Sequence, residues 1–463
     1  MNLKKNTMKK NLFCYLLLLA TPLFAEEKGD KLPSNFFMKK LNNGLEVLVI
    51  EDKTVPLATI EICVKNGSYT ETKDYNGLSH LYEHMFFKAN KEYPSQEKFL
   101  ERVNELGIVF NGTTSNERVN YYVTLNNTKL TEGLRFINAA IRYPLFDKEE
   151  MKKENVVVDG EFQRNESNPV FFLFDALNHK LWKDNYCRKN VIGDHDIINT
   201  ATPEKMKIVQ DKFYHPNNAI IVIAGDVNHT EVHTLVEKIY GDWQASTYDV
   251  FQKYPIPEFE KLTKNEPFIV VNDNARVPFI TIGWQGPDTR TDLKSTYAAD
   301  VFSYILGQQS SKLQKDLIDS GLAFNANLSY QTCKHTGPIQ MFVAANPSKL
   351  NECIAKIKEH VAMWDSDAYY TDDELANAKQ LLAIDDFYSK EKTSDFIHTV
   401  TFWWCSASID YYTNYIANIK AITRDDIKSY VRTYINEKPA AYGILVNTST
   451  KEKLNINEAI FGL

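Results

Sequence analysis

The chain has 463 residues, of which 43% are hydrophobic and 24% are charged, a composition typical of a globular protein with material for two or three domains. Its formal net charge is −7, and it falls to about −11 without the first 25 residues, which contain four lysines and no acidic residue. This acidic balance does not indicate a nucleic-acid-binding surface.

Residues 1–25 have the pattern of a secretory signal peptide. Four lysines precede an apolar run at 12–20, and the small residue Ala25 follows at the expected cleavage point. A membrane anchor is the alternative, but the run is shorter than the roughly 20 residues that span a bilayer. We therefore expect removal of residues 1–25, a periplasmic or secreted location, and no membrane span in the mature chain.

The first predicted elements after the signal are a β-rich segment at 44–65 and a helix at about 77–88. On this helix His80 and His84 are four residues apart, so their imidazoles leave the same face, as two ligands of one metal ion require. Glu83 lies beside them, where it could take a proton from a metal-bound water. Because a catalytic zinc needs a third protein ligand, this helix alone leaves two interpretations open: a metal site, or polar residues scattered on a half-buried helix.

The later elements follow in the same order in both halves of the chain. Three strand-rich segments have counterparts: 44–65 with 268–284, 107–125 with 323–346, and 218–226 with 440–446. Helical patterns lie between them. Because strands and helices cluster rather than alternate strictly, the sequence predicts an α+β fold in which each half holds a largely antiparallel sheet packed with helices.

Similarity between the halves indicates an internal repeat. The segment VPLATI at 55–60 resembles VPFITI at 277–282 with an offset of 222, and matches between 202–219 and 423–440 have an offset of 221. Two separated matches at nearly one offset favour two homologous domains. The predicted parts are a signal peptide at 1–25, a first domain at 26–248, a linker at 249–267 and a second domain at 268–463.

Cysteines are few in the mature chain. The five that follow residue 25 are Cys63, Cys187, Cys333, Cys353 and Cys405. No two of them have C-x-x-C spacing, so the sequence predicts neither a disulfide framework nor a cysteine zinc site. We expect an exported enzyme whose stability comes from its hydrophobic core.

The segment HLYEH at 80–84 resembles the inverted zinc-peptidase motif, H-x-x-E-H, of the pitrilysin and insulinase family of metallopeptidases. That family takes its third ligand from a glutamate 77 residues after the second histidine, with another acidic residue seven positions earlier. Glu161 and Glu154 occupy these positions here, and a spacing of seven places both on one helix face. The resemblance implies Zn²⁺ held by His80, His84 and Glu161, with Glu154 orienting the ligating histidines.

The family builds its subunits from two similar α+β domains, and only the first of each pair binds zinc. Shifted by the repeat offset, the four motif positions fall on apolar residues: Phe302, Ile305, Leu306, and Leu382 or Ala383. The resemblance therefore implies that the second domain is a degenerate repeat without a metal site.

The stretch GIVFNGTTSNERVNYYV at 107–123 resembles the family's exposed strand edge, on which a substrate peptide pairs as an extra strand. Asn111 and Gly112 stand where the family has Asn-Ala. Main-chain pairing gives affinity without a strict sequence requirement, and the resemblance implies that Asn111, Gly112 and Thr113 bind substrate. An ordinary hairpin with an Asn-Gly turn is the alternative.

One departure from the family concerns the second domain. Members that cleave unaided carry there an arginine and a tyrosine, seven residues apart, that help to bind substrate and stabilise the oxyanion. These positions hold Leu317 and Phe324 here, whose side chains cannot donate a hydrogen bond, and such a donor contributes on the order of 3 to 4 kcal/mol. We hypothesise a zinc-bearing subunit of a hetero-oligomer whose related partner subunit supplies this pair; a homodimer is also compatible.

The resemblance as a whole implies a zinc endopeptidase that cleaves short unfolded peptides in a closed chamber. Zinc would lower the pKa of its bound water toward roughly 7, and Glu83 would take the proton and pass it to the leaving amine. Two alternatives remain: a non-catalytic assembly or peptide-binding subunit of the same fold, and a zinc hydrolase that acts on substrates other than peptides.

Overall fold

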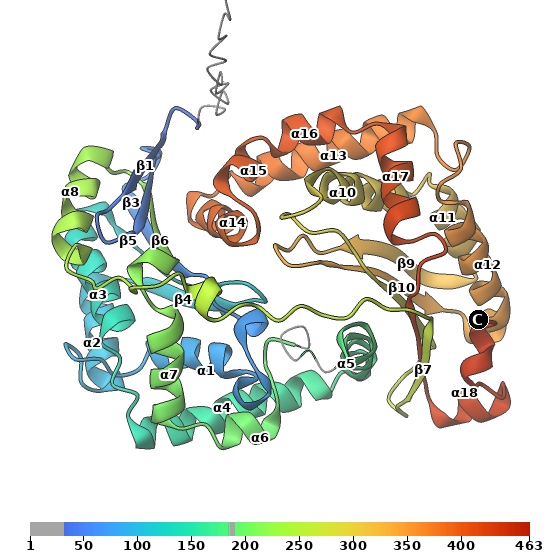
Figure 1. Ribbon diagram of the computed structural model, residues 1–463, viewed down its shortest axis with the longest axis horizontal. Helices are drawn as coiled ribbons and strands as arrows, with labels where there is room; N and C mark the ends of the chain where they lie inside the picture. The colour runs from blue at the N-terminus through green and yellow to red at the C-terminus, as the bar shows by residue number, and fades with distance from the viewer. Residues whose placement is uncertain (1–31, 184, 186–189) are drawn as a thin grey trace, which may run out of the picture. The chain divides into compact units, whose positions relative to one another are not determined.

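Two β-sheets, one in each half of the sequence, organise the chain (Figure 1). The computed structural model describes residues 32–183, 185 and 190–463, so the predicted signal peptide at 1–25 and Cys187 lie outside the described residues. Within the described ranges, no helix is both long and apolar enough to cross a membrane.

The first sheet contains six strands in the described part of the chain. In spatial order they are β1 (Phe36–Lys40), β2 (Glu46–Glu51), β6 (Ala219–Gly225), β3 (Leu57–Val64), β5 (Val119–Asn126) and β4 (Val109–Thr114). Neighbouring strands are antiparallel, except that β2 and β6 are parallel. Among the described strands β4 pairs with β5 alone, so its other side is an open edge.

The second sheet repeats this topology. Its strands, in spatial order, are β7 (Glu266–Val271), β11 (Ala441–Val446), β8 (Phe279–Gln285), β10 (Pro338–Ala345) and β9 (Ala323–Tyr330). Here β7 and β11 are the parallel pair, and the order matches β2, β6, β3, β5 and β4 of the first sheet. The predicted α+β class, with two homologous and largely antiparallel sheets, is confirmed.

Equivalent helices also begin in the same way in the two halves. Helix α7 (Pro203–Phe213) begins after Thr202, whose hydroxyl accepts a hydrogen bond from the backbone N–H of Lys205. Helix α17 (Arg424–Tyr434) begins after Thr423, whose hydroxyl accepts from Asp426. These threonines satisfy N–H groups that a helix start leaves unpaired.

The helices of the first half pack mainly on one face of the first sheet. They are α1 (Leu78–Phe86), α2 (Gln96–Leu106), α3 (Leu130–Arg142), α4 (Lys148–Glu166), α5 (Pro169–Trp182), α6 (His195–Asn199), α7 and α8 (His229–Tyr240). With the exception of α5, their apolar side chains enclose the first core together with the sheet. The predicted linker at 249–267 contains helix α9 (Val250–Lys253), and its last two residues begin β7.

The helices of the second half pack mainly around a second core. They are α10 (Leu293–Gly307), α11 (Lys312–Gln314), a π-helical turn η6 (Lys315–Asp319), α12 (Leu350–Met363), α13 (Asp372–Ser389), α14 (Thr393–Ser406), α15 (Ile409–Thr413), α16 (Tyr415–Ala421), α17 and α18 (Thr448–Lys453).

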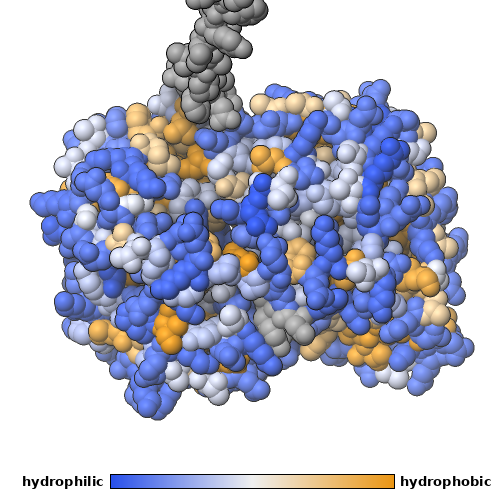
Figure 2. All heavy atoms as spheres, viewed as in Figure 1, coloured by the Kyte–Doolittle hydropathy of each residue, from blue (hydrophilic) through white to orange (hydrophobic). Residues whose placement is uncertain are grey.

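On the face drawn in Figure 2, hydrophilic residues predominate and hydrophobic ones are scattered, as expected where the large apolar side chains lie inside.

One helix from each half covers the outer face of the other half's sheet. Helix α5 packs on the second sheet through Leu173, Leu177 and Leu181, and α14 packs on the first sheet through a cluster that includes Val400 and Trp404. Both faces of each sheet are therefore covered, which explains why every residue of β6 is buried. Residues Leu32–Leu463 form one compact unit.

Candidate metal centre

Helix α1, which carries the histidine pair, is held at its N-terminus by a buried glutamate. Gly77 precedes the helix with φ 92°, a left-handed conformation that favours glycine. The Glu71 carboxylate accepts hydrogen bonds from the backbone N–H groups of Gly77 (2.8 Å) and Ser79 (2.7 Å). Burial raises the pKa of Glu71 to about 7, although these hydrogen bonds act in the opposite direction. Sequence reasoning missed Glu71 because it lies too far before the helix for a usual capping residue.

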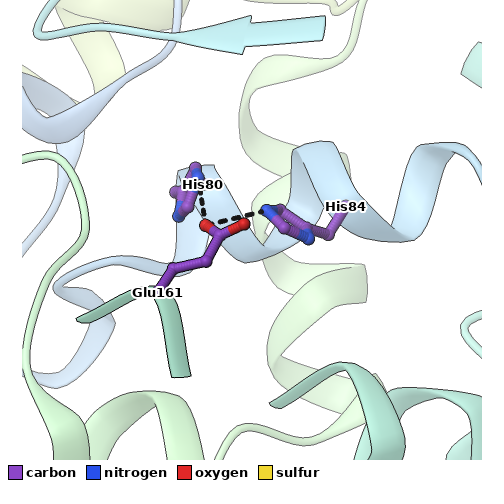
Figure 3. A group of neighbouring side chains, drawn as sticks. All are labelled: His80, His84 and Glu161. Atoms are coloured by element: carbon purple, nitrogen blue, oxygen red, sulfur yellow. Dashed lines mark ion pairs between the residues drawn. The ribbon is translucent and has the colours of Figure 1, made fainter. Parts of the chain in front are cut away.

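The three expected metal ligands meet between α1 and α4 (Figure 3). His80 Nε2 and His84 Nε2 lie 3.8 Å and 3.7 Å from the same carboxylate oxygen, Oε2 of Glu161. The ligand atoms of the three residues all lie within 4.8 Å of one another, and this is the one such group of three or more found among the described residues. All three side chains are partly exposed.

These distances suit a shared cation. They exceed the length of an N–H···O hydrogen bond, while zinc bonds of about 2.0 to 2.2 Å to each atom would fit between the donors. Burial, followed by the charge of His84, lowers the pKa of His80 to about 4, so His80 is neutral at neutral pH, as a metal ligand must be. Two imidazoles and one carboxylate form the donor set of a catalytic zinc site.

Glu154 and Lys88 orient one of the histidines. His84 Nδ1 lies 2.8 Å from Glu154 Oε1, and Lys88 Nζ lies 2.6 Å from Glu154 Oε2. Burial alone would raise the pKa of Glu154, but the hydrogen bonds from His84 and Lys88 lower it overall. With Nδ1 donating to Glu154, the lone pair of His84 Nε2 faces Glu161. The sequence pattern indicated Glu154 but not Lys88, whose contact is tertiary.

Glu83, on the same helix, is held by the edge strand. Its side chain is buried, and its Oε2 accepts a hydrogen bond of 2.6 Å from the Thr114 hydroxyl on β4. Burial raises the pKa of Glu83, opposed by this hydrogen bond. Sequence reasoning missed Thr114, although it is the neighbour of a predicted substrate-binding residue.

The three predicted substrate-binding residues lie on β4. Asn111 and Gly112 pair with Tyr122 and Tyr121 of β5, so they are strand residues, and the alternative of a turn at Asn111-Gly112 is wrong. Asn111 and Thr113 are exposed. A Cβ atom at Gly112 would lie 2.9 Å from Glu83 Cγ, so glycine lets the backbone of the edge strand approach Glu83 closely.

The second half offers no equivalent site within its described residues. The counterparts Phe302, Ile305 and Leu306 are buried on α10, and Leu382 is buried on α13. α10 and α13 contact each other, as α1 and α4 do in the first half, but the side chains at the four shifted positions are apolar.

The structure also locates the two residues that depart from the resemblance. Leu317 is fully buried in the second core, within η6. Phe324 is 60% exposed on the edge strand β9. Neither side chain carries a hydrogen-bond donor.

Comparison with known families gives two matches, and the second of them begins within the first half of the chain, before α7 and β6. Residues 46–195 match the family described as "Insulinase (Peptidase family M16)", and residues 200–382 match the one described as "Peptidase M16 inactive domain". All four residues of the predicted zinc and proton-transfer site lie in the first match.

Two relatives with similar sequences are named as zinc proteases. The chain is 26% identical over 324 residues to the zinc protease PqqE of Helicobacter pylori, which covers 68% of this chain and 71% of that protein. It is 24% identical over 354 residues to the uncharacterized zinc protease YmxG of Bacillus subtilis, which covers 76% of this chain and 84% of that protein.

Solved structures show the same fold. A protease from Helicobacter pylori superimposes with a TM-score of 0.78 at 21% identity, covering 89% of this chain and 99% of that one. The periplasmic protease PqqL from Escherichia coli superimposes with a TM-score of 0.73 at 17% identity, covering 93% of this chain and 49% of that one. From the two domain matches, these relatives and the shared fold, we conclude that the chain belongs to the insulinase family of peptidases, family M16.

Proposed function

We propose that this protein is a zinc endopeptidase whose metal is held by His80, His84 and Glu161. The observation that carries the proposal is the convergence of these three donors, which lie within 4.8 Å of one another beside the buried carboxylate of Glu83. Zinc bound there would supply Lewis acidity, polarising a peptide carbonyl and lowering the pKa of a water ligand toward neutrality.

Glu83 is the proposed proton carrier. One of its oxygens is occupied by the Thr114 hydroxyl, so the second oxygen is left to take a proton from the attacking water. The same carboxyl then delivers that proton to the amine of the leaving group. Burial, which raises the pKa of Glu83, moves this carboxyl toward the range in which it can both accept and donate a proton. Glu154 keeps His84 oriented throughout.

The open edge of β4 is the proposed substrate-binding surface. An extended peptide can pair with the free backbone groups of this strand, which leaves specificity to side chains rather than to the main chain. Asn111, Gly112 and Thr113 would lie along such a peptide, and the close approach of Gly112 to Glu83 would bring its backbone next to the proton carrier. We propose short unfolded peptides as the substrate class.

A related subunit is the proposed partner. The described second half presents Leu317 and Phe324 where an arginine and a tyrosine would stabilise the oxyanion, and a hetero-oligomer with a related family member would supply them. A homodimer would bring a second Leu317 and Phe324, and therefore would not add these donors. A periplasmic or secreted location is proposed from the sequence of residues 1–25 and from similarity to the periplasmic PqqL.

A second candidate function is a non-catalytic peptide-binding or assembly subunit. The match of residues 200–382 to an inactive domain and the apolar residues at both donor positions favour it. In that case the β4 edge would still bind peptides, but no bond would be cleaved.

Peptide cleavage and zinc content, measured together, distinguish these candidates. The chain without residues 1–25 is purified beside its Glu83→Gln variant, and both are tested on unstructured fluorogenic peptides. Zinc in both proteins with cleavage by the parent alone supports a complete peptidase and refutes the need for a partner. Zinc in both proteins without cleavage supports either an incomplete peptidase or a non-catalytic subunit. Addition of a related subunit then distinguishes these two, because only the incomplete peptidase would gain activity. Failure of either protein to bind zinc refutes the site.

A further inference from the structure

Helix α14 and strand β3 bring two cysteines from opposite halves of the chain into contact. Along β3, Ile60 and Ile62 point into the first core, whereas Glu61 and Cys63 point to the other face, which α14 covers. The Sγ atoms of Cys63 and Cys405 lie 3.5 Å apart. Both residues are buried, with 0% and 2% of their surface exposed.

This contact is distinct among the cysteines that the structure describes. Cys333 contacts the Tyr69 hydroxyl, and Cys353 is buried in the second core. A disulfide bond is about 2.0 Å long, so Cys63 and Cys405 need to approach by about 1.5 Å. Small side-chain rotations on a strand and a facing helix can provide a movement of that size.

Polar contacts beside the two sulfurs fix α14 against β3. The buried Glu61 carboxylate is hydrogen-bonded to His398 and to the Thr401 hydroxyl, both on α14. Arg118, from the loop that follows β4, donates to Thr401 at 3.0 Å. Because Glu61 and Cys63 are two residues apart on one strand face, these bonds keep Cys405 opposite Cys63.

We propose that Cys63 and Cys405 form a disulfide bond that joins the two halves of the protein when the chain folds in an oxidising compartment. The natural occurrence of the bond rests on the proposed export, whereas its formation in vitro does not. The oxidant is a disulfide, either a small molecule such as oxidised glutathione or a protein disulfide. One thiolate attacks it and forms a mixed disulfide, and the second thiolate then displaces the remaining sulfur. The Cys63–Cys405 bond forms, the oxidant's bond breaks, and the two thiol protons pass to its released thiols.

Burial raises the pKa of the Cys63 thiol, and the attacking species is the thiolate. The bond therefore forms during folding, before α14 covers Cys63, and the folded reduced protein is oxidised slowly. Once formed, the bond is shielded from reductants by the apolar cluster of Phe396, Val400 and Trp404 around it.

Thiol counting tests the proposal directly. The protein without residues 1–25 is denatured, reduced, and refolded in a buffer containing reduced and oxidised glutathione. Its thiols are then alkylated under denaturing conditions, and the mass is measured. We expect Cys63 and Cys405 to escape alkylation until the protein is reduced, and we expect a peptide that links the two. Alkylation of Cys63 and Cys405 in the refolded protein, or a linkage of either one to another cysteine, would overturn the proposal. This outcome does not depend on peptidase activity.

The thermal midpoint provides a second readout. A bond that closes a loop of several hundred residues should raise the unfolding midpoint of the oxidised parent by about 5 °C or more over the reduced parent. The Cys63→Ala and Cys405→Ala variants should show no response to reductant, while Cys353→Ala, a change of equal size at another buried cysteine, should keep the parent's response. An equal response in all four proteins would refute the assignment. The thiol count on the parent decides the question if a variant does not fold.

Discussion

Replacing Lys88 with methionine would remove the charge that holds Glu154 while keeping most of the apolar stem. The Lys88–Glu154 pair is largely buried, with side chains 14% and 8% exposed and 2.6 Å between Nζ and Oε2. Removing one partner of a buried pair costs about 3 to 5 kcal/mol. Glu154 keeps its contact with His84, so we expect the free energy of unfolding of the zinc-free protein to fall by an amount near the lower end, about 3 kcal/mol.

The same substitution should also weaken zinc binding. Residues that orient metal ligands typically change metal affinity by about 10- to 100-fold, and Lys88 acts on His84 only through Glu154, so we expect a loss of about tenfold. Urea unfolding of the zinc-free protein and competition with a chromogenic chelator measure the two effects. Lys98→Met is the matched control, because Lys98 pairs with Glu101 on the exposed face of α2. If Lys88→Met unfolds like Lys98→Met and binds zinc as the parent does, the Lys88–Glu154 contact has no role in the site.

Three further predictions address other parts of the structure. Thr114→Val removes the hydroxyl that donates to Glu83 and should lower kcat/KM of the active form by roughly 10- to 100-fold, the effect of losing a hydrogen bond to a charged group, with zinc content unchanged. Gly443→Ala places a Cβ atom 2.1 Å from Phe268 Cζ and should lower the free energy of unfolding by about 2 kcal/mol through overpacking, as measured by chemical denaturation. Glu71 binds a proton more tightly in the folded state, with a pKa raised from 4.5 to about 7, so its contribution is fully present below pH 4.5 and lost as the pH rises through 7. Relative to Glu71→Gln, the parent should therefore lose about 3 kcal/mol of stability over this interval, as measured by urea unfolding at several pH values.

Each of these predictions has a clear contrary result. Unchanged kinetics in Thr114→Val would mean that Glu83 does not depend on β4 for its orientation. A Gly443→Ala protein as stable as the parent would show that the Phe268 ring can move aside without loss of packing. A stability difference between the parent and Glu71→Gln that stays constant from pH 4.5 to pH 8 would show that Glu71 titrates as it does in the unfolded chain.

Much of the fold could be predicted from local patterns and from the repeat. The offset near 222 residues anticipated that β3 and β8 would occupy the same place in two equivalent sheets, because repeated sequences adopt the same supersecondary structure. The spacing of His80 and His84 followed from helical geometry alone, whereas Glu161 could be selected among many glutamates only through the family's spacing.

The remaining contacts join residues whose sequence separation carries no signal. Lys88, Thr114 and Glu71 act through side chains that meet only after strands and helices have packed. The sequence of α5 shows an apolar helix but not which sheet it covers, since leucines would pack equally well on either one. Cys63 and Cys405 are likewise paired by the position of α14, which no local pattern specifies.

The exchange of α5 and α14 between the halves makes each half depend on the other to cover one face of its sheet. Helix α5 of the first half covers the second sheet, and α14 of the second half covers the first sheet. Separation of the halves would therefore expose apolar surface on both sheets at once. A single cut in the connecting segment 254–265 should therefore leave two fragments that remain associated. A half produced alone would present a bare sheet face to water and would aggregate. The half without metal ligands therefore stabilises the half that carries His80, His84 and Glu161, because its helix α14 covers the first sheet.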